Sequence, residues 1–456
     1  MNLKPDILAA IGRTPLVKLN KVVPEGAAQV WVKCEYLNPS GSIKDRMASY
    51  IVARAEEQGL LKPGGLIVEN TSGNTGQGLA MAAAVKGYRC VFTMPDKMSK
   101  EKQDSLRAYG AEVIITPTDV PGDSPEHYVN VAKRIAEETP GAFYVDQYHS
   151  QWNIEAHYHS TGREIFEDTD GGKFDAFVGG TGTGGTVSGI GRWFKEHAPQ
   201  VKIIGADPLG SVHYHLFHTG TLPTAHVYMV EGIGEDIECR AMDFSVVDDM
   251  RQVNDRDSFM MARRLVREEG LFCGGSSGSN VHVAIEIAKE LGPGKVVVTV
   301  LPDHGNRYVS KFLSDAWMRE KGFTGAEREL GSVEELLKRR RQRPLTAPAE
   351  TPLRAIIAMM REHGVSQIPL IERGKLNAIV HESDILKALQ QPGADLAAPA
   401  MSVASSIAGL IYPKARIEEL FHIFATDHVA IVVDASEVVG VISKIDLIEF
   451  LESRGR

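Results

Sequence analysis

The stretch FDAFVGGTGTGGTVSGIGRWF at residues 174–194 predicts a strand, a glycine-rich turn and a helix in succession. FDAFV is short and apolar, as expected for a buried strand, and VSGIGRWF has a helical pattern. Between them, the backbone N–H groups of Thr181 to Thr186 can surround an anion at the helix N-terminus, and the glycines allow close approach. The stretch therefore predicts an anion-binding unit.

The residues at the end of this loop and beyond it limit which anions it can bind. It does not end in the GKS or GKT of a nucleotide-triphosphate loop. A dinucleotide site would need an acidic residue about 20 residues further on within a clean βαβ unit. Asp207 lies at roughly that distance, so dinucleotide binding stays open. A small phosphate ester fits the loop better.

The surrounding pattern defines the fold class. From about residue 5 to 325, short β-branched runs alternate with longer helical patterns, which is typical of α/β folds with mostly parallel sheets. Ligands of such folds gather where the strands end and the glycine-rich turns begin. The clearest strand candidates are residues 66–69, 90–94, 112–116, 176–178, 201–206 and 295–301.

Composition limits the class of protein. The chain has 456 residues, 43% of them hydrophobic and 24% charged, which indicates a soluble globular protein with two or three domains. Its net charge of −9 argues against broad nucleic-acid binding. We expect a cytoplasmic protein, because no signal peptide or membrane span is evident and the cysteines are scattered. These are Cys34, Cys90, Cys239 and Cys273.

After Pro344 the pattern changes to two shorter units of the same design. Each runs from an amphipathic helix through two strands to a second helix, and Asp384 and Asp446 occupy equivalent positions. One such unit buries too little apolar surface to be stable alone, so the two are expected to pack together. The expected organisation is a catalytic domain at 1–325, a linker at 326–345, and repeat domains at 346–394 and 395–456.

Three further segments combine glycine with hydroxyl groups: NPSGSIKDR at 38–46, TSGNTGQG at 71–78 and GGSSGS at 274–279. TSGNTGQG precedes a helix expected at about 79–85, where its donors and the helix dipole would suit a carboxylate, although an ordinary capping loop is the other interpretation. Lys44 stands in the first turn of a helix, an unfavourable place for a cation. Burial there would lower its pKa and favour a neutral, nucleophilic amine.

Together these segments resemble the fold-type II pyridoxal phosphate (PLP) enzymes, and among them the cystathionine β-synthase family. The resemblance extends from about Ile7 to Met318, and the terminal repeats resemble a tandem pair of CBS domains. It implies two open twisted α/β subdomains followed by that pair. The supporting motifs are PDKMSxEK at 95–102, DQY at 146–148, VEGIG at 230–234, LPD at 301–303 and KFLSDAWM at 311–318.

The resemblance also implies roles for individual residues. Lys44 would form the Schiff base with PLP, Asn74 would contact the ring 3′-oxygen, and Ser276 would face the pyridine nitrogen. The phosphate would be held by Gly182, Thr183, Gly184, Gly185 and Thr186. The substrate carboxylate would be held by Thr71, Ser72, Thr75 and Gln147, with Tyr148, Gly232 and Glu235 lining the substrate pocket.

The activity implied is β-replacement. Lys44 would remove the Cα proton of serine, hydroxide would leave to give a bound aminoacrylate, and homocysteine would add to give cystathionine. Hydrogen sulfide production from cysteine is a related reaction. Because the catalytic pattern begins almost at residue 1, we expect no haem-binding extension. Glu235 stands where several relatives carry tyrosine, which leaves its contact with the second substrate open.

Other ligands are less well supported. The pair His157 and His159, and the group at 213–218, lack the spacing and carboxylates of a metal site, so no metal is expected. The adenosine-binding pattern of CBS domains is present as Ser443 and Asp446, but His381 replaces the hydroxyl residue in the first repeat. One nucleoside site, for an adenosyl ligand, or a dimerising role is expected. A homodimer is the default assembly.

Three other functions stay open. Cysteine synthase uses the same fold with O-acetylserine and sulfide, and serine or threonine dehydratase needs no thiol. A nucleotide sensor with an inactive PLP fold is an alternative of a different class. KDR after the lysine turn, LPD, DQY and the CBS pair favour the cystathionine β-synthase interpretation, and intact Lys44, Asn74 and Ser276 argue against the sensor.

Overall fold

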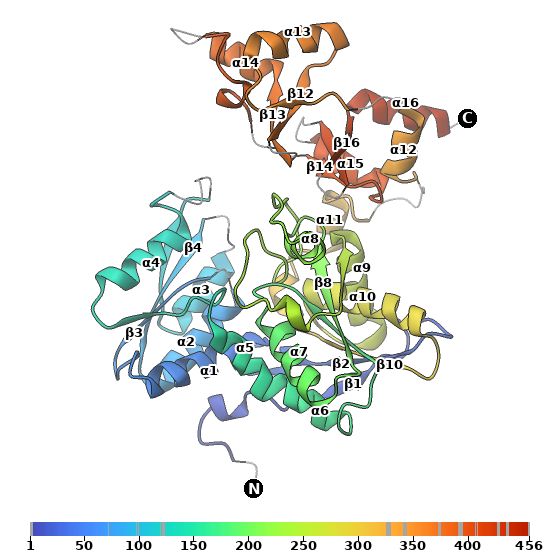
Figure 1. The fold of residues 1–456 in the computed structure, drawn as a ribbon. Helices are drawn as coiled ribbons and strands as arrows, with labels where there is room; N and C mark the ends of the chain where they lie inside the picture. The colour runs from blue at the N-terminus through green and yellow to red at the C-terminus, as the bar shows by residue number, and fades with distance from the viewer. Residues whose placement is uncertain are drawn as a thin grey trace. The chain divides into compact units, whose positions relative to one another are not determined.

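The computed structural model describes residues 3–71, 73–96, 98, 100–118, 120, 124–324, 330–340, 344–372, 375–390, 395–405, 407, 409–425, 429–434 and 437–454. The chain divides into two compact units (Figure 1). The first contains Met1–Phe217 and Tyr228–Leu313, and the second contains His218–Val227 and Ser314–Arg456. This division falls earlier than residue 325, where we expected the catalytic domain to end.

The larger sheet of the first unit has the strand order β1-β2-β10-β7-β8-β9. Only β1 pairs antiparallel with its neighbour, β2; all other pairs in this sheet are parallel. The strands are β1 Leu16–Lys18, β2 Gln29–Lys33, β7 Ala176–Gly180, β8 Lys202–Pro208, β9 Asp249–Val253 and β10 Val296–Val300.

Helices cover both faces of this sheet. Ala176 and Val178 face the core formed with α9 (Asp255–Glu269) and α10 (Gly275–Leu291). Phe177, which points to the opposite side of β7, belongs to the core formed with α7 (Gly185–His197). This alternation explains why the strands are apolar on both sides. The remaining helices beside this sheet are α5 Gln151–His157, α6 Arg163–Asp168 and α8 His213–Thr219.

The smaller sheet of the first unit is entirely parallel, with the order β5-β4-β3-β6. Its strands are β3 Leu66–Asn70, β4 Arg89–Pro95, β5 Glu112–Thr116 and β6 Ala142–Tyr144, and its helices are α1 Lys44–Glu57, α2 Asn74–Lys86, α3 Lys100–Ala108 and α4 Tyr128–Glu138. The expected pair of open α/β subdomains is confirmed, as are all six strand candidates within two residues at each end. The helix expected at about 79–85 begins earlier, at Asn74.

The second unit confirms the internal repeat. Each repeat combines a short parallel strand pair with an antiparallel pair, and the two sheets meet through Leu376, Ile379, Ile431 and Val433. The first repeat comprises β11 Ala347–Pro348, α13 Leu353–His363, β12 Gln367–Glu372, β13 Lys375–His381 and α14 Glu382–Leu389. The second comprises β14 Leu410–Ile411, α15 Ile417–Ala425, β15 Ala430–Asp434, β16 Glu437–Ile442 and α16 Lys444–Arg454.

Two helices precede the repeats, α11 Asp315–Glu320 and α12 Val333–Arg340. Val333 and Leu336 of α12 are 0% and 2% exposed and belong to the core of the second repeat, beside Ile411. The stretch 326–345, expected as a linker, therefore contributes a helix to a folded core. Among the described residues, no helix is both long and apolar enough to cross a membrane.

Candidate active site

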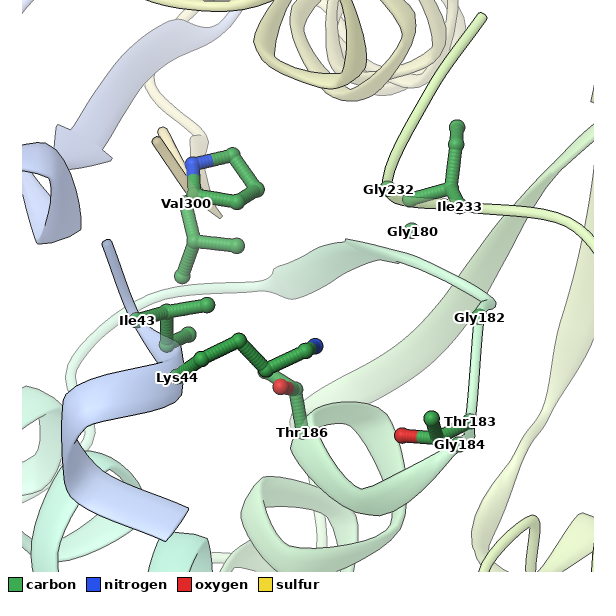
Figure 2. Close-up of a pocket in the computed structure, with 11 residues that line it drawn as sticks. Ile43, Lys44, Gly180, Gly182, Thr183, Gly184, Thr186, Gly232, Ile233 and Val300 are labelled. Atoms are coloured by element: carbon green, nitrogen blue, oxygen red, sulfur yellow. The ribbon is translucent and has the colours of Figure 1, made fainter. Parts of the chain in front are cut away.

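The strand ends of the larger sheet open onto a pocket that joins several of the predicted residues (Figure 2). Ile43 and Lys44 enter from the start of α1, and the loop between β7 and α7 forms another wall. The pocket is lined by Ile43, Lys44, Gly180, Gly182, Thr183, Gly184, Thr186, Gly232, Ile233, Val300 and Pro302. Six of these were predicted as site residues: Lys44, Gly182, Thr183, Gly184, Thr186 and Gly232.

Lys44 supplies the one amine among these lining residues. Its side chain extends from the first turn of α1 into the pocket, toward the β7–α7 loop (Figure 2). Burial lowers the pKa of Lys44, although the carboxylates of Glu235 and Asp303 act in the opposite direction. The helix N-terminus adds a field that disfavours the cation. A lowered pKa favours the neutral form of the amine, the form that can act as a nucleophile or base.

The β7–α7 loop forms a cradle whose shape requires glycine. Gly184 has φ +92°, and a Cβ there would lie 2.4 Å from Cα of Met242. A Cβ on Gly185 would lie 2.0 Å from Oδ1 of Asn153. With no side chains on these residues, the N–H groups at the start of α7 can approach an anion directly. The cradle fits a phosphate group.

Ser276 lies in the first turn of α10 and is only 1% exposed. Its hydroxyl has no hydrogen-bond partner among the described residues. A buried hydroxyl without a partner is costly, so a ligand group is expected to satisfy it. Gly232 of the pocket is close, since a Cβ there would lie 3.8 Å from Oγ of Ser276. This position fits the ring nitrogen of PLP.

Asn74, the first residue of α2, is held by an acid that our site prediction did not include. Its Nδ2 donates to Oδ2 of Asp303 at 2.9 Å, and the Tyr308 hydroxyl donates to the same oxygen at 2.7 Å. Asp303 is buried, and burial raises its pKa. The only sequence signal for Asp303 was the LPD motif. Its carboxylate fixes the Asn74 amide beside the pocket.

The predicted carboxylate site joins the start of α2 to the segment after β6. The Thr71 hydroxyl accepts the N–H groups of Gly73 and Gly76, both at 3.3 Å. Thr75 Oγ1 donates to Oε1 of Gln147 at 2.7 Å. Thr71, Thr75 and Gln147 thus surround one helix N-terminus, a favourable place for a carboxylate. Ser72 lies outside the described residues.

Glu235 follows the Gly232–Gly234 segment beside the phosphate cradle. A Cβ on Gly182 would lie 3.9 Å from Glu235 Oε1. Burial and the neighbouring Asp236 raise the pKa of Glu235 to about 8, against the opposing effect of Lys44. The charge of Glu235 in turn raises the pKa of the Tyr148 hydroxyl. Glu235 is therefore electrostatically coupled to both Lys44 and Tyr148.

The predicted nucleoside residues of the second unit are engaged with each other. Ser443 donates its N–H and its hydroxyl to Oδ2 of Asp446, which caps α16. In the first repeat the N–H of His381 donates to Asp384 Oδ2 at 2.9 Å, and the Ser405 hydroxyl donates to Oδ1 at 3.0 Å. Both aspartates therefore serve helix caps.

The histidines considered for metal binding lie apart from any ligand cluster. Among the described residues, no group of three His, Cys, Asp or Glu side chains is arranged to hold a metal ion. His157 instead hydrogen-bonds two threonine hydroxyls, Thr161 and Thr186. All four cysteines are buried.

A lysine of lowered pKa, a phosphate cradle and a buried hydroxyl without a partner, gathered at the strand ends of an α/β fold, define a PLP-dependent enzyme. Comparison with known proteins agrees: residues 7–303 match the pyridoxal-phosphate dependent enzyme family, and residues 333–391 and 410–453 match the CBS domain.

Its relatives and a solved structure support this assignment. The cystathionine β-synthase of Mus musculus is 41% identical, over 99% of this chain and 86% of that protein. The Dictyostelium discoideum enzyme of the same name is 36% identical over 98% of this chain and 92% of that protein. More narrowly, therefore, the chain belongs to the cystathionine β-synthase family. The crystal structure of an O-ureido-L-serine synthase covers 70% of this chain and 99% of its own, with 38% identity and a TM-score of 0.63.

Proposed function

We propose that this enzyme condenses L-serine with L-homocysteine to form cystathionine, replacing the β-hydroxyl with the thiol. The observation that carries the proposal is the pocket that joins Lys44, whose pKa is lowered, to the phosphate cradle. The names of the relatives, which are cystathionine β-synthases over nearly the whole chain, supply the reaction.

The described residues suit the cofactor and the first substrate. PLP would be held by the loop at 182–186, Asn74 and Ser276, with Lys44 as its covalent partner. The cofactor supplies an electron sink that makes the Cα proton of bound serine acidic. Thr71, Thr75 and Gln147 orient the serine carboxylate, and Ser72 completes this set in the proposal.

Lys44 moves the proton in both halves of the reaction. Its amine takes the proton from Cα while the β-hydroxyl leaves as hydroxide, and it returns a proton to Cα after the homocysteine sulfur has bonded to Cβ. Burial supports this cycle, because it lowers the pKa of Lys44 and so favours the neutral amine that must accept the Cα proton. Tyr148, Gly232 and Glu235 border the space in which the second substrate would bind.

The second unit and the assembly belong to the same proposal. An adenosyl ligand would bind at the second repeat near Ser443 and Asp446, since CBS domains are ligand-binding modules. Asp446 would then contact the ligand while it also caps α16. We propose a cytoplasmic homodimer that uses PLP, with neither haem nor metal, and that can release hydrogen sulfide when cysteine replaces serine.

A second candidate reaction is cysteine synthase. The solved structure of an O-ureido-L-serine synthase shows that 38% identity extends to an enzyme named for an O-substituted serine. The two candidate reactions differ in the group that leaves Cβ, which is hydroxide from serine and acetate from O-acetylserine.

The deciding experiment supplies purified full-length protein and PLP with two substrate pairs, serine with homocysteine and O-acetylserine with sulfide. We expect cystathionine to form with the higher kcat/KM, and Lys44→Ala to abolish both activities. A far higher kcat/KM for cysteine formation would assign the enzyme as a cysteine synthase. Protein that neither binds PLP nor reacts would favour the nucleotide-sensor alternative.

A further inference from the structure

One face of α5 contacts two hydroxyl groups of the phosphate cradle, those of Thr183 and Thr186. Asn153 and His157 are four residues apart and therefore point to the same side of the helix. Asn153 Nδ2 lies 3.0 Å from Thr183 Oγ1, and His157 Nε2 lies 3.2 Å from Thr186 Oγ1. Asn153 and His157 are 2% and 1% exposed. Neither was among the predicted site residues.

The packing of α5 against α7 makes this contact close. A Cβ on Gly189 of α7 would lie 2.4 Å from the carbonyl oxygen of Ile154 and 2.6 Å from Cβ of His157. Any larger residue at 189 would push α5 away from the cradle. The glycine therefore lets the two side chains of α5 reach hydroxyls at the N-terminus of α7.

The orientation of the Asn153 amide is fixed by a second contact. Its Nδ2 also donates to the carbonyl oxygen of Gln147 at 2.9 Å. Because a carbonyl can only accept, the nitrogen must face this way, and the same nitrogen donates to the Thr183 hydroxyl. The hydrogen of that hydroxyl is then available to a phosphate. The contact also links the cradle to Gln147 of the carboxylate site.

His157 contacts Thr186 in the way that Asn153 contacts Thr183. Its other nitrogen, Nδ1, lies 2.8 Å from Oγ1 of Thr161, a fully buried residue in the π-helical turn Tyr158–Gly162. Burial, with the nearby cations Lys44 and Arg46, lowers the pKa of His157 well below its usual value. The ring is therefore neutral and carries one N–H, so its two nitrogens must play opposite roles.

We propose that Asn153 and His157 are positioning residues that set the hydroxyls of Thr183 and Thr186 as hydrogen-bond donors to the PLP phosphate. In this arrangement Thr161 donates to Nδ1 of His157, and Nε2–H donates to Thr186 Oγ1. The hydroxyls of Thr183 and Thr186 then each accept a hydrogen bond from α5 and direct their own hydrogen at the anion. The inference rests on PLP as the cofactor and not on which thiol is the second substrate.

Affinity for PLP itself tests the role of His157. Full-length apoprotein would be titrated with PLP, and the dissociation constant and the ³¹P resonance of bound PLP recorded. His157→Leu removes the donor that orients Thr186, and we expect the dissociation constant to rise about 10- to 100-fold, as for loss of the Thr186 hydrogen bond to the charged phosphate. His157→Gln places an amide N–H near the same point and should stay within a few-fold of the parent protein.

The matched control is His213→Leu. His213 is also fully buried, lies on α8 outside the lining of the pocket, and has no partner for either ring nitrogen among the described residues. Its replacement should leave the dissociation constant unchanged. Equal loss of PLP affinity in the Leu and Gln variants at 157, or no loss in either, would overturn the donor role.

Asn153 offers a test that depends on the direction of its hydrogen bond. In Asn153→Asp the carboxylate can only accept, so Thr183 would turn its hydrogen away from the phosphate and the new charge would repel it. Asn153→Ala leaves the hydroxyl free to reorient. We expect PLP to bind more weakly to Asn153→Asp than to Asn153→Ala. The opposite order would contradict the proposal, whatever the reaction of the enzyme.

Discussion

Arg46, two residues beyond Lys44, anchors the helix that presents the reactive amine. Its Nε lies 2.6 Å from Oε2 of Glu35, and its Nη1 lies 2.7 Å from Oε1 of Glu164. The Arg46 and Glu35 side chains are 2% and 0% exposed. These contacts hold the pKa of Glu35 below its usual range. This bidentate, buried ion pair ties α1 to the segment that contains Glu35 in one defined geometry.

We predict that Arg46→Met destabilises the first unit by about 3 to 5 kcal/mol, because it leaves the Glu35 charge buried without its partner. Urea unfolding followed by tryptophan fluorescence would measure this, since three of the four tryptophans, Trp31, Trp152 and Trp193, lie in that unit. Glu35→Gln in the same chain should restore part of the loss. Equal stability of the single variant and the parent would contradict the prediction.

The residues that sequence alone could assign are those inside local motifs. The phosphate loop at 182–186 could be predicted from its own composition, whereas the roles of Lys44 and Ser276 were implied by the resemblance of the short motifs in which they stand. His157 could not be, since its partners Thr161 and Thr186 come from a π-helical turn and another helix. Spacing along the chain was used only to weigh a metal site at His157, which it did not favour, and it carries no signal for a contact with the phosphate loop.

At the scale of elements, hydrophobic runs predicted strands where both faces of a sheet are buried. Both β5 and β9 are edge strands. β5, EVIIT at 112–116, was predicted with its observed bounds because it is rich in β-branched residues, whereas β9, DMRQV at 249–253, was missed because three of its five residues are polar. The start of α2 was placed too late because Gly76 and Gly78 disfavour a helix. Close packing decides there: a Cβ on Gly78 would lie 2.9 Å from Cβ of Ala48.

The loop between β7 and α7 gives a prediction at this scale. Gly184→Ala places a methyl group 2.4 Å from a backbone atom at a positive φ, so the loop must move. We expect at least a tenfold rise in the dissociation constant for PLP, since a displacement of the cradle lengthens several N–H contacts with the phosphate together. Titration of the apoprotein with PLP would measure it.

Gly26→Ala is the matched control for this variant. Gly26 also has a positive φ, +81°, but nothing lies within 4 Å of its would-be Cβ. It therefore carries the same kind of backbone strain without the clash. If Gly26→Ala weakened PLP binding as much as Gly184→Ala does, backbone strain and not the shape of the cradle would explain the effect.

At the scale of the whole molecule, a hydrophobic core can include residues that lie outside its repeat in the sequence. Val333 and Leu336 precede the first repeat in sequence but are buried in the core of the second, beside Ile411 and Val432. The sequence has a basic run here that is followed by proline, a pattern typical of a linker. Two apolar residues on one face of a short helix are too few to indicate a buried helix. Only the three-dimensional packing assigns α12 to the second repeat.

We predict that Leu336→Ala destabilises the second repeat by about 2 to 5 kcal/mol, the usual cost of truncating a buried leucine. Lys338→Ala in the same helix is the control, because its side chain is 70% exposed. Hydrogen exchange of the full-length protein would report the result: amides of β14 and β15 should exchange faster in the leucine variant alone, while those of the first unit should not change. Unaltered exchange in β15 would mean that α12 is a linker after all, and the repeat domains could then be cut from the chain at residue 345 without loss of stability.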